Sequence, residues 1–190
     1  MSGVQSRKKT RDTMGTLIAV YVRCSDPATA ASLLVDQPHA FAESGSTFYA
    51  IEKSIEEYQP PVVEMGDLSK RFKTDVIWLA FQSVVDAFEF HHWHNGVYLR
   101  GLVYGCYGEE RTWDQVRGEA EPWESEAFFQ PSELESLLEY VANGTEVEEF
   151  KRIWRERIIS PGNREPSVDA REAARKVAEF YRLPGWSLTG

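Results

Sequence analysis

Residues 84–106 read VVDAFEFHHWHNGVYLRGLVYGC, and this stretch decides the fold. Asn95-Gly96 lies between two runs rich in aromatic and β-branched residues, which is the sequence signature of a β-hairpin with a two-residue turn. Asn and Gly both accept the positive φ angles that a type I′ turn requires. The stretch therefore predicts two antiparallel strands joined at residues 95–96.

A two-residue loop also predicts the register of this hairpin. The predicted pairs are His94 with Val97, His92 with Leu99, Phe90 with Gly101 and Phe88 with Val103. Because side chains alternate along a strand, these residues share one face, apolar except for the two histidines near the turn. The opposite face is predicted to be aromatic and charged, and it carries Glu89, His91, Trp93, Tyr98, Arg100, Leu102 and Tyr104.

The remaining strands and helices follow from hydrophobic period and capping signals. Asp75–Gln82 is apolar at almost every position, which indicates a central strand buried on both faces. Other strands are predicted at Thr16–Cys24, Thr47–Ile51 and Arg111–Arg117. Helices are predicted after Asp26-Pro27, from Asp67 to Phe72, after capping boxes at Ser132 and Thr145, and from Asp169 onward.

This order of elements predicts an α+β fold. We expect a mixed, largely antiparallel sheet of five or six strands with C-terminal helices packed on one face. Residues 1–13 are predicted to be a mobile basic tail. Residues 14–190 are predicted to form a single domain, with a sheet region at 14–129 and a helical region at 131–190.

Composition excludes several classes of protein. A hydrophobic fraction of 42% and six tryptophans indicate a packed core, and no apolar run approaches the roughly 20 residues of a membrane span. The N-terminus does not resemble a signal peptide, and the two cysteines fit reduced, buried thiols, so a cytoplasmic protein is expected. The net charge of −9 makes a nucleic-acid partner unlikely.

The negative charge is concentrated in the middle of the chain. Residues 109–150 contain 13 acidic and two basic side chains, a local net charge of −11. Residues 119–126 are predicted to be a charged loop in which Glu121 and Glu124 flank Trp123. This loop is either a solvated surface or a docking patch for a basic partner, and in both cases charge reversal at the two glutamates would leave the fold intact.

The second hairpin face is the other candidate interaction surface. Trp93, Tyr98 and Tyr104, with Arg100 among them, form a predicted aromatic–cationic ladder, a composition typical of interface hot spots. The alternative is that C-terminal helices cover this face, with Trp154 and Tyr181 packed against it.

The hairpin histidines raise two further hypotheses. His92 and His94 project to one face, as a metal site requires, but no third ligand lies nearby, so no metal is predicted. His91 is predicted to lie near Glu89 and Arg100, an arrangement open to acid–base chemistry but far commoner as surface ion pairing. No catalytic residue and no cofactor is predicted.

One segment resembles a known family. The pattern Ser83-Val84-Val85-Asp86-x-Phe88-x-Phe90, then Trp93-x-Asn95-Gly96, a Leu-Arg strand and an acidic Pro-Trp segment, is similar to an uncharacterised bacterial family. The resemblance covers about residues 75–125. It implies a shared strand–turn–strand hairpin and no activity.

Together these features favour a non-enzymatic binding or adaptor protein, or an accessory subunit of a bacterial cytoplasmic assembly. It would contact a protein partner through the aromatic hairpin face and the acidic segment. The sequence also leaves a homo-oligomer open. The alternative is a small hydrolase or metal-dependent enzyme that uses the histidine-rich hairpin.

Overall fold

The computed structural model describes residues 15–54, 60–106, 110–141 and 143–186, so the predicted tail at 1–13 lies outside the described residues. Its centre is one six-stranded sheet in which every pairing is antiparallel, with the strand order β2-β1-β3-β4-β5-β6. The α+β class and the largely antiparallel sheet are confirmed. The strands are β1 (Thr16–Arg23), β2 (Phe48–Glu52), β3 (Asp75–Gln82), β4 (Ala87–His94), β5 (Val97–Cys106) and β6 (Arg111–Gly118).

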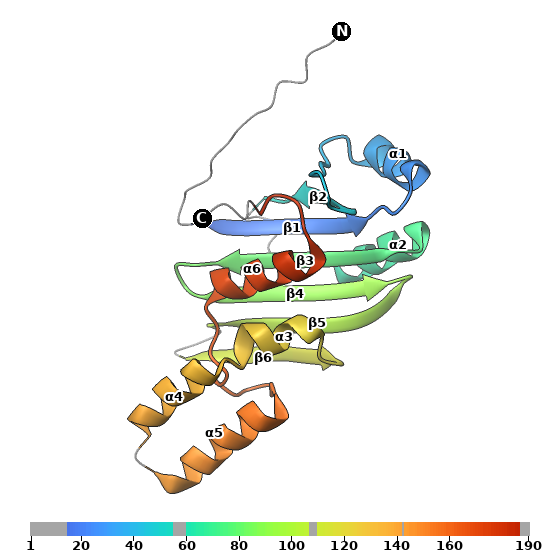
Figure 1. Ribbon diagram of the computed structural model, residues 1–190. Coiled ribbons are helices and arrows are strands. Elements are labelled where there is room, and N and C mark those ends of the chain that lie inside the picture. The colour runs from blue at the N-terminus through green and yellow to red at the C-terminus, as the bar shows by residue number, and fades with distance from the viewer. Residues whose placement is uncertain (1–14, 55–59, 107–109, 142, 187–190) are drawn as a thin grey trace.

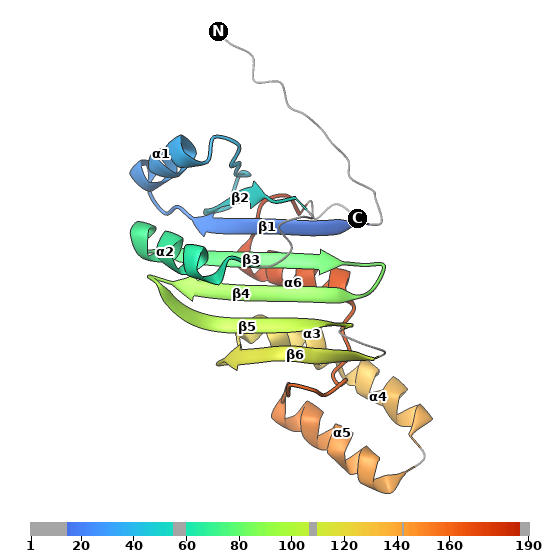
Figure 2. The same ribbon diagram turned by 180° about the vertical axis from the view of Figure 1, so that it is seen from behind.

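Helices cover both faces of the sheet (Figures 1 and 2). The described helices are α1 (Pro27–Asp36), α2 (Val62–Phe72), α3 (Pro122–Phe128), α4 (Pro131–Tyr140), α5 (Gly144–Glu156) and α6 (Ala170–Tyr181). Helices α1 and α2 lie on one face, and α3 and α6 lie on the other. Helices α4 and α5 extend beyond the β6 edge of the sheet, so only part of the C-terminal helical region packs on the sheet as predicted.

Strand β3 occupies the centre of the sheet, as its uninterrupted apolar run predicts. Alternate side chains enter two separate cores: Ile77 and Leu79 face α3 and α6, whereas Val76 and Trp78 face α1 and α2. All four side chains are fully buried. The sheet is therefore the shared wall of two cores, and polar side chains on β3 and β4 can reach either side of it.

The predicted register of the hairpin is correct at the turn and wrong beyond it. His94 pairs with Val97, but a β-bulge follows: Trp93 pairs with Tyr98, and His92 pairs with Arg100. Leu99 is the extra residue of this bulge, and one extra residue moves every later side chain to the opposite face. Phe90 therefore pairs with Leu102 instead of Gly101, and Phe88 with Tyr104 instead of Val103.

Several predicted helix boundaries also need correction. The acidic stretch expected to be a loop forms α3, with Glu121 as its N-cap and Glu124 completing a capping box. Helices α4 and α5 begin after Gln130 and Asn143, not after the predicted boxes. Helix α2 begins at Val62, one and a half turns before the predicted cap.

The turn provides a stability test of the hairpin. Gly96 has a φ angle of +81°, and a Cβ atom there would lie 2.9 Å from the Lys70 Cβ atom on α2. We expect Gly96→Val to lower the free energy of unfolding by about 1 kcal/mol or more, because a β-branched residue resists positive φ. Urea denaturation monitored by tryptophan fluorescence measures this change.

Gly144 is the matched control, because its φ angle is not positive and an added Cβ atom would have no neighbour within 4 Å. Gly144→Val is expected to change stability by less than Gly96→Val does. Equal losses in the two variants would show that the left-handed turn is not what makes Gly96 necessary.

Candidate functional site

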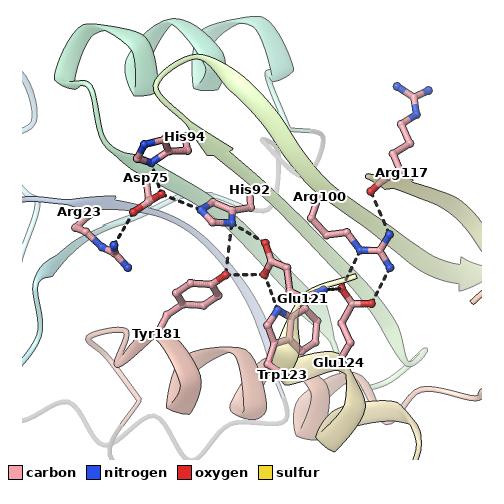
Figure 3. A network of polar contacts seen from close by, with 10 residues as sticks. All are labelled: Arg23, Asp75, His92, His94, Arg100, Arg117, Glu121, Trp123, Glu124 and Tyr181. Atoms are coloured by element: carbon pink, nitrogen blue, oxygen red, sulfur yellow. Dashed lines mark hydrogen bonds and ion pairs between the residues drawn. The ribbon is translucent and has the colours of Figure 1, made fainter. Parts of the chain in front are cut away.

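A polar network, buried at Asp75 and His92 and exposed at His94, links the hairpin to α3 and α6 (Figure 3). We call it the His92 network, and its members are Arg23, Asp75, His92, His94, Glu121 and Tyr181. The His92 ring contacts a carboxylate on each side: Nδ1 lies 2.6 Å from Glu121 Oε1, and Nε2 lies 3.3 Å from Asp75 Oδ1. The ring is therefore held between two acids inside the molecule.

Strand register and helix ends bring these groups together. Asp75 is the first residue of β3 and pairs with His94 at the end of β4, where His94 Nδ1 lies 2.6 Å from Asp75 Oδ1. Arg23, at the end of β1, places NH1 2.7 Å from Asp75 Oδ2. From the other side, the Tyr181 hydroxyl at the end of α6 donates to Glu121 Oε2 at 2.6 Å.

Contacts within the network shift the pKa values of Asp75, His92 and Glu121. Burial opposes ionisation of Asp75, but hydrogen bonds from His92 and His94 and the charge of Arg23 outweigh it and lower the pKa to about 2. Burial disfavours the imidazolium of His92, yet its bonds to Asp75 and Glu121 raise its pKa above the ordinary value. The pKa of Glu121 is lowered because the same contacts outweigh its burial. All three shifts favour an imidazolium held between two carboxylates.

A buried ion pair between Arg100 and Glu124 adjoins the His92 network. Arg100 donates to both carboxylate oxygens of Glu124, from Nε at 2.8 Å and from NH2 at 2.6 Å. Its remaining nitrogen, NH1, donates to the backbone carbonyls of Arg117 and Gly118 at the end of β6. Arg100 and Glu124 are only 3% and 2% exposed, so this pair joins β5, β6 and α3 inside the protein.

The opposite face of the hairpin carries a separate hydrogen-bonded chain. Glu89 Oε1 lies 2.9 Å from His91 Nε2, and His91 Nδ1 lies 2.6 Å from the Tyr98 hydroxyl. The Tyr98 hydroxyl oxygen lies 1.7 Å from where a Cβ atom on residue 101 would be, so only glycine leaves room for it. Burial raises the pKa of Tyr98 to about 12, and the phenol keeps its proton at neutral pH.

Beside this chain, α2 and the hairpin enclose an open groove of about 360 Å³. We call it the α2–hairpin groove. Trp93 and Tyr98 form its strand side. Their rings pack edge to face, with 5.2 Å between the ring centroids. Val62 and Val63 form its helix side, and both are exposed. The lining is completed by Gly66, Asp67, Lys70 and Gly96.

The predicted binding residues are divided among these places. Trp93 and Tyr98 line the groove, but the predicted ladder is wrong: Arg100 and Tyr104 point to the opposite face because of the bulge. Both are buried, and so is Trp123, which packs on Phe90. Glu121 and Glu124, expected at a solvated surface, are bound internally.

The predicted group of Glu89, His91 and Arg100 is also only partly formed. Glu89 and His91 are hydrogen-bonded, whereas Arg100 lies across the sheet from them. Sequence reasoning placed His92 and His94 on one face but missed their partner Asp75. The apolar run that identified β3 begins at Asp75, and an acid at that point was a usable signal.

Two properties of the described residues concern metal binding and membranes. No group of three or more His, Cys, Asp or Glu side chains among them is arranged to hold a metal ion. None of the described helices is both long and apolar enough to cross a membrane.

Comparison with protein-family models, with curated protein sequences and with solved structures finds no match to this chain. The likeness to a bacterial family at residues 75–125 therefore stays a prediction. The features that bear on function are the groove and the three polar clusters.

Proposed function

We propose that this chain is a non-enzymatic binding protein that docks a protein partner in the α2–hairpin groove. The observation that carries the proposal is the lining of the groove. The half-buried Tyr98 forms one side over Trp93, which is only 2% exposed, and the exposed Val62 and Val63 lie opposite. An accessible tyrosine beside an open apolar rim is typical of interface hot spots.

The rigidity of the groove supports this role. Tyr98 is held by His91 and fits over Gly101, and the Ser69 hydroxyl of α2 accepts from the Gly96 backbone amide at 3.1 Å. Both sides of the groove are thus fixed to each other before any partner arrives. When a partner inserts an apolar side chain, few groove side chains have to be ordered, so little conformational entropy is lost on this side of the interface.

The buried polar clusters favour binding over catalysis as well. In the His92 network, the imidazole is engaged on both nitrogens by ionised carboxylates. An imidazole in that state has no free nitrogen with which to take a proton from a substrate. Its contacts support a structural role, in which it ties α3 and α6 to the sheet.

The proposal is tested with one surface variant. Val63 is 76% exposed on the first turn of α2, so Val63→Asp is expected to preserve the fold. It would place a charge at the apolar rim. We expect partners captured from a lysate of the native host, identified by mass spectrometry, to bind the purified variant about tenfold more weakly or worse.

Val84→Asp is the matched control, since Val84 is 70% exposed on the turn between β3 and β4, away from the groove. The control is expected to bind the same partner as tightly as the unmodified chain. If both variants, or neither, lose binding of the captured partner, the groove is not the docking site.

The second candidate is a small hydrolase that uses the histidine-rich hairpin. It is favoured by one contact series, because Glu89, His91 and Tyr98 are linked in the order carboxylate, imidazole, hydroxyl. We rank it below binding, since the Tyr98 hydroxyl with its raised pKa is a poor nucleophile at neutral pH and is tucked against Gly101.

A further inference from the structure

Helices α4 and α5 form a hairpin with an incompletely covered apolar stripe. The base of this hairpin is anchored: Trp154 packs edge to face on Phe129 and donates to the Gln130 carbonyl at 3.0 Å. Toward its tip the apolar side chains are only half-buried, and α4 has no buried residue. The half-buried set is Leu134, Leu137, Leu138, Val141, Val147 and Phe150, of which Leu134, Leu137 and Phe150 also pack against the main core.

The position of the hairpin explains this exposure. It extends past the β6 edge, so neither face of the sheet lies over it (Figures 1 and 2). Two helices alone cannot enclose an apolar stripe, because each offers the other only one line of contact. Tyr140, at the end of α4, is 86% exposed.

The charges beside the stripe specify what fits there. At 100° per residue, Glu135 borders the leucine stripe of α4 on one side and Glu133 borders it on the other. Helix α4 contains no basic residue, and none of these glutamates pairs with a Lys or Arg side chain in the described part of the chain. The stripe is therefore bordered by unpaired negative charge.

We propose that the α4–α5 hairpin is a second interaction surface, and that it binds a basic amphipathic helix of another protein. The apolar face of that helix would cover the stripe, and its Lys or Arg side chains would meet the glutamates of α4. The sequence predicts an acidic docking surface at Glu121 and Glu124, but both side chains are bound internally. We therefore place the acidic docking surface on α4.

A second copy of this chain is a poorer occupant. Its α5 helix contains basic residues, but Lys151 and Arg152 already pair with Glu148 and Glu149 of their own helix. Each copy also has a net charge of −9, and two acidic α4 helices would repel each other. An external basic helix meets neither obstacle.

Two labelled peptides test the proposal by fluorescence anisotropy. Both have the same leucine face and helical length, and they differ only in lysine or glutamate on the polar face. We expect the full chain to bind the lysine peptide at least about tenfold more tightly at low salt. High salt should reduce this preference, because it screens exposed charges. Equal affinities would overturn the proposal.

Two double variants of the protein show where on its surface the lysine peptide binds. Glu133→Lys/Glu135→Lys changes only exposed side chains that flank the stripe and should reverse the preference between the peptides. Glu43→Lys/Glu64→Lys makes the same change in net charge at exposed positions near α1 and on α2, and should preserve the preference. If both pairs act alike, overall charge explains the binding and the proposal fails.

Two further measurements separate the remaining outcomes. Light scattering should give the mass of one chain, and a dimer that Glu133→Lys/Glu135→Lys abolishes would identify a second copy as the occupant and overturn the proposal. Val63→Asp should leave peptide binding unchanged, since the α2–hairpin groove is a different surface. A loss of peptide binding in that variant would assign the peptide to the groove instead.

Discussion

Replacing Glu124 by alanine is expected to lower the free energy of unfolding by about 3–5 kcal/mol, because the substitution leaves a buried arginine without its partner. Arg100 meets Glu124 through two parallel hydrogen bonds, and both side chains are almost completely shielded from water. Glu124 Oε1 also accepts from the Glu121 backbone amide at 2.8 Å, so the variant loses a helix cap as well. Chemical denaturation measures the loss.

Glu126→Ala is the control, because Glu126 lies on the same helix with a side chain that is 74% exposed. It is expected to change stability by about 0.5 kcal/mol or less. A double variant, Arg100→Met/Glu124→Leu, should recover part of the loss, since it removes the unpaired charge. Recovery stays partial because the Arg117 and Gly118 carbonyls lose their donor. Similar stability of Glu124→Ala and Glu126→Ala would contradict the buried-pair interpretation.

The contacts of Glu124 also differ from what composition predicts for the acidic segment. From composition alone, Glu121 and Glu124 belong to a charged surface loop whose charges can be reversed without harm. In the folded chain they form the first turn of α3 and reach across to β4, β5 and α6. Charge density in a sequence does not reveal which acids have a buried basic partner, because such partners come from distant segments.

Features with a local cause were predictable from the sequence. Asn95-Gly96 specifies its turn through backbone φ, and the apolar run of β3 indicates burial on both faces. Asp26 and Asp169 were identified as helix starts, and each side chain accepts from a backbone amide three residues on. Each of these signals lies within one element, so no knowledge of the packing was needed.

Features with a tertiary cause were not predictable. The bulge at Leu99 turns Arg100 toward Glu124, and it is stabilised by contacts with β6 and α3 that the hairpin sequence does not contain. The same holds for the candidate site. His92 meets a carboxylate 17 residues away and a hydroxyl 89 residues away, so its surroundings depend on strand order and on the docking of α6.

The His92 network predicts a distinct pH dependence of stability. The pKa of His92 is raised in the folded protein, so its contribution is complete below the unfolded value of about 6.5 and is lost as pH rises through the folded pKa. The pKa values of Asp75 and Glu121 are lowered, so their contributions are complete above about 4.5 and are lost as pH falls. The network therefore stabilises most between about pH 4.5 and 6.5.

His92→Gln tests this prediction, because glutamine retains a hydrogen-bond donor but carries no charge between Asp75 and Glu121. We expect the variant to be about 3 kcal/mol less stable at acidic pH within that window, because the buried Glu121 carboxylate loses its cation while Asp75 keeps its contacts with Arg23 and His94. The deficit should shrink as pH rises above neutrality, since the imidazole of the unmodified chain also loses its charge there. Denaturant titrations at a series of pH values measure both changes.

An exposed histidine outside the His92 network provides the control for His92→Gln. His39 lies on the surface after α1, so His39→Gln should follow the unmodified chain at every pH. Asp75→Asn tests one side of the ring. It removes one of the carboxylates that raise the pKa of His92, so the loss of stability with rising pH should be smaller and should end at a lower pH than in the unmodified chain. A His92→Gln deficit that stays constant across the whole range would mean that His92 contributes packing and hydrogen bonds but no charge.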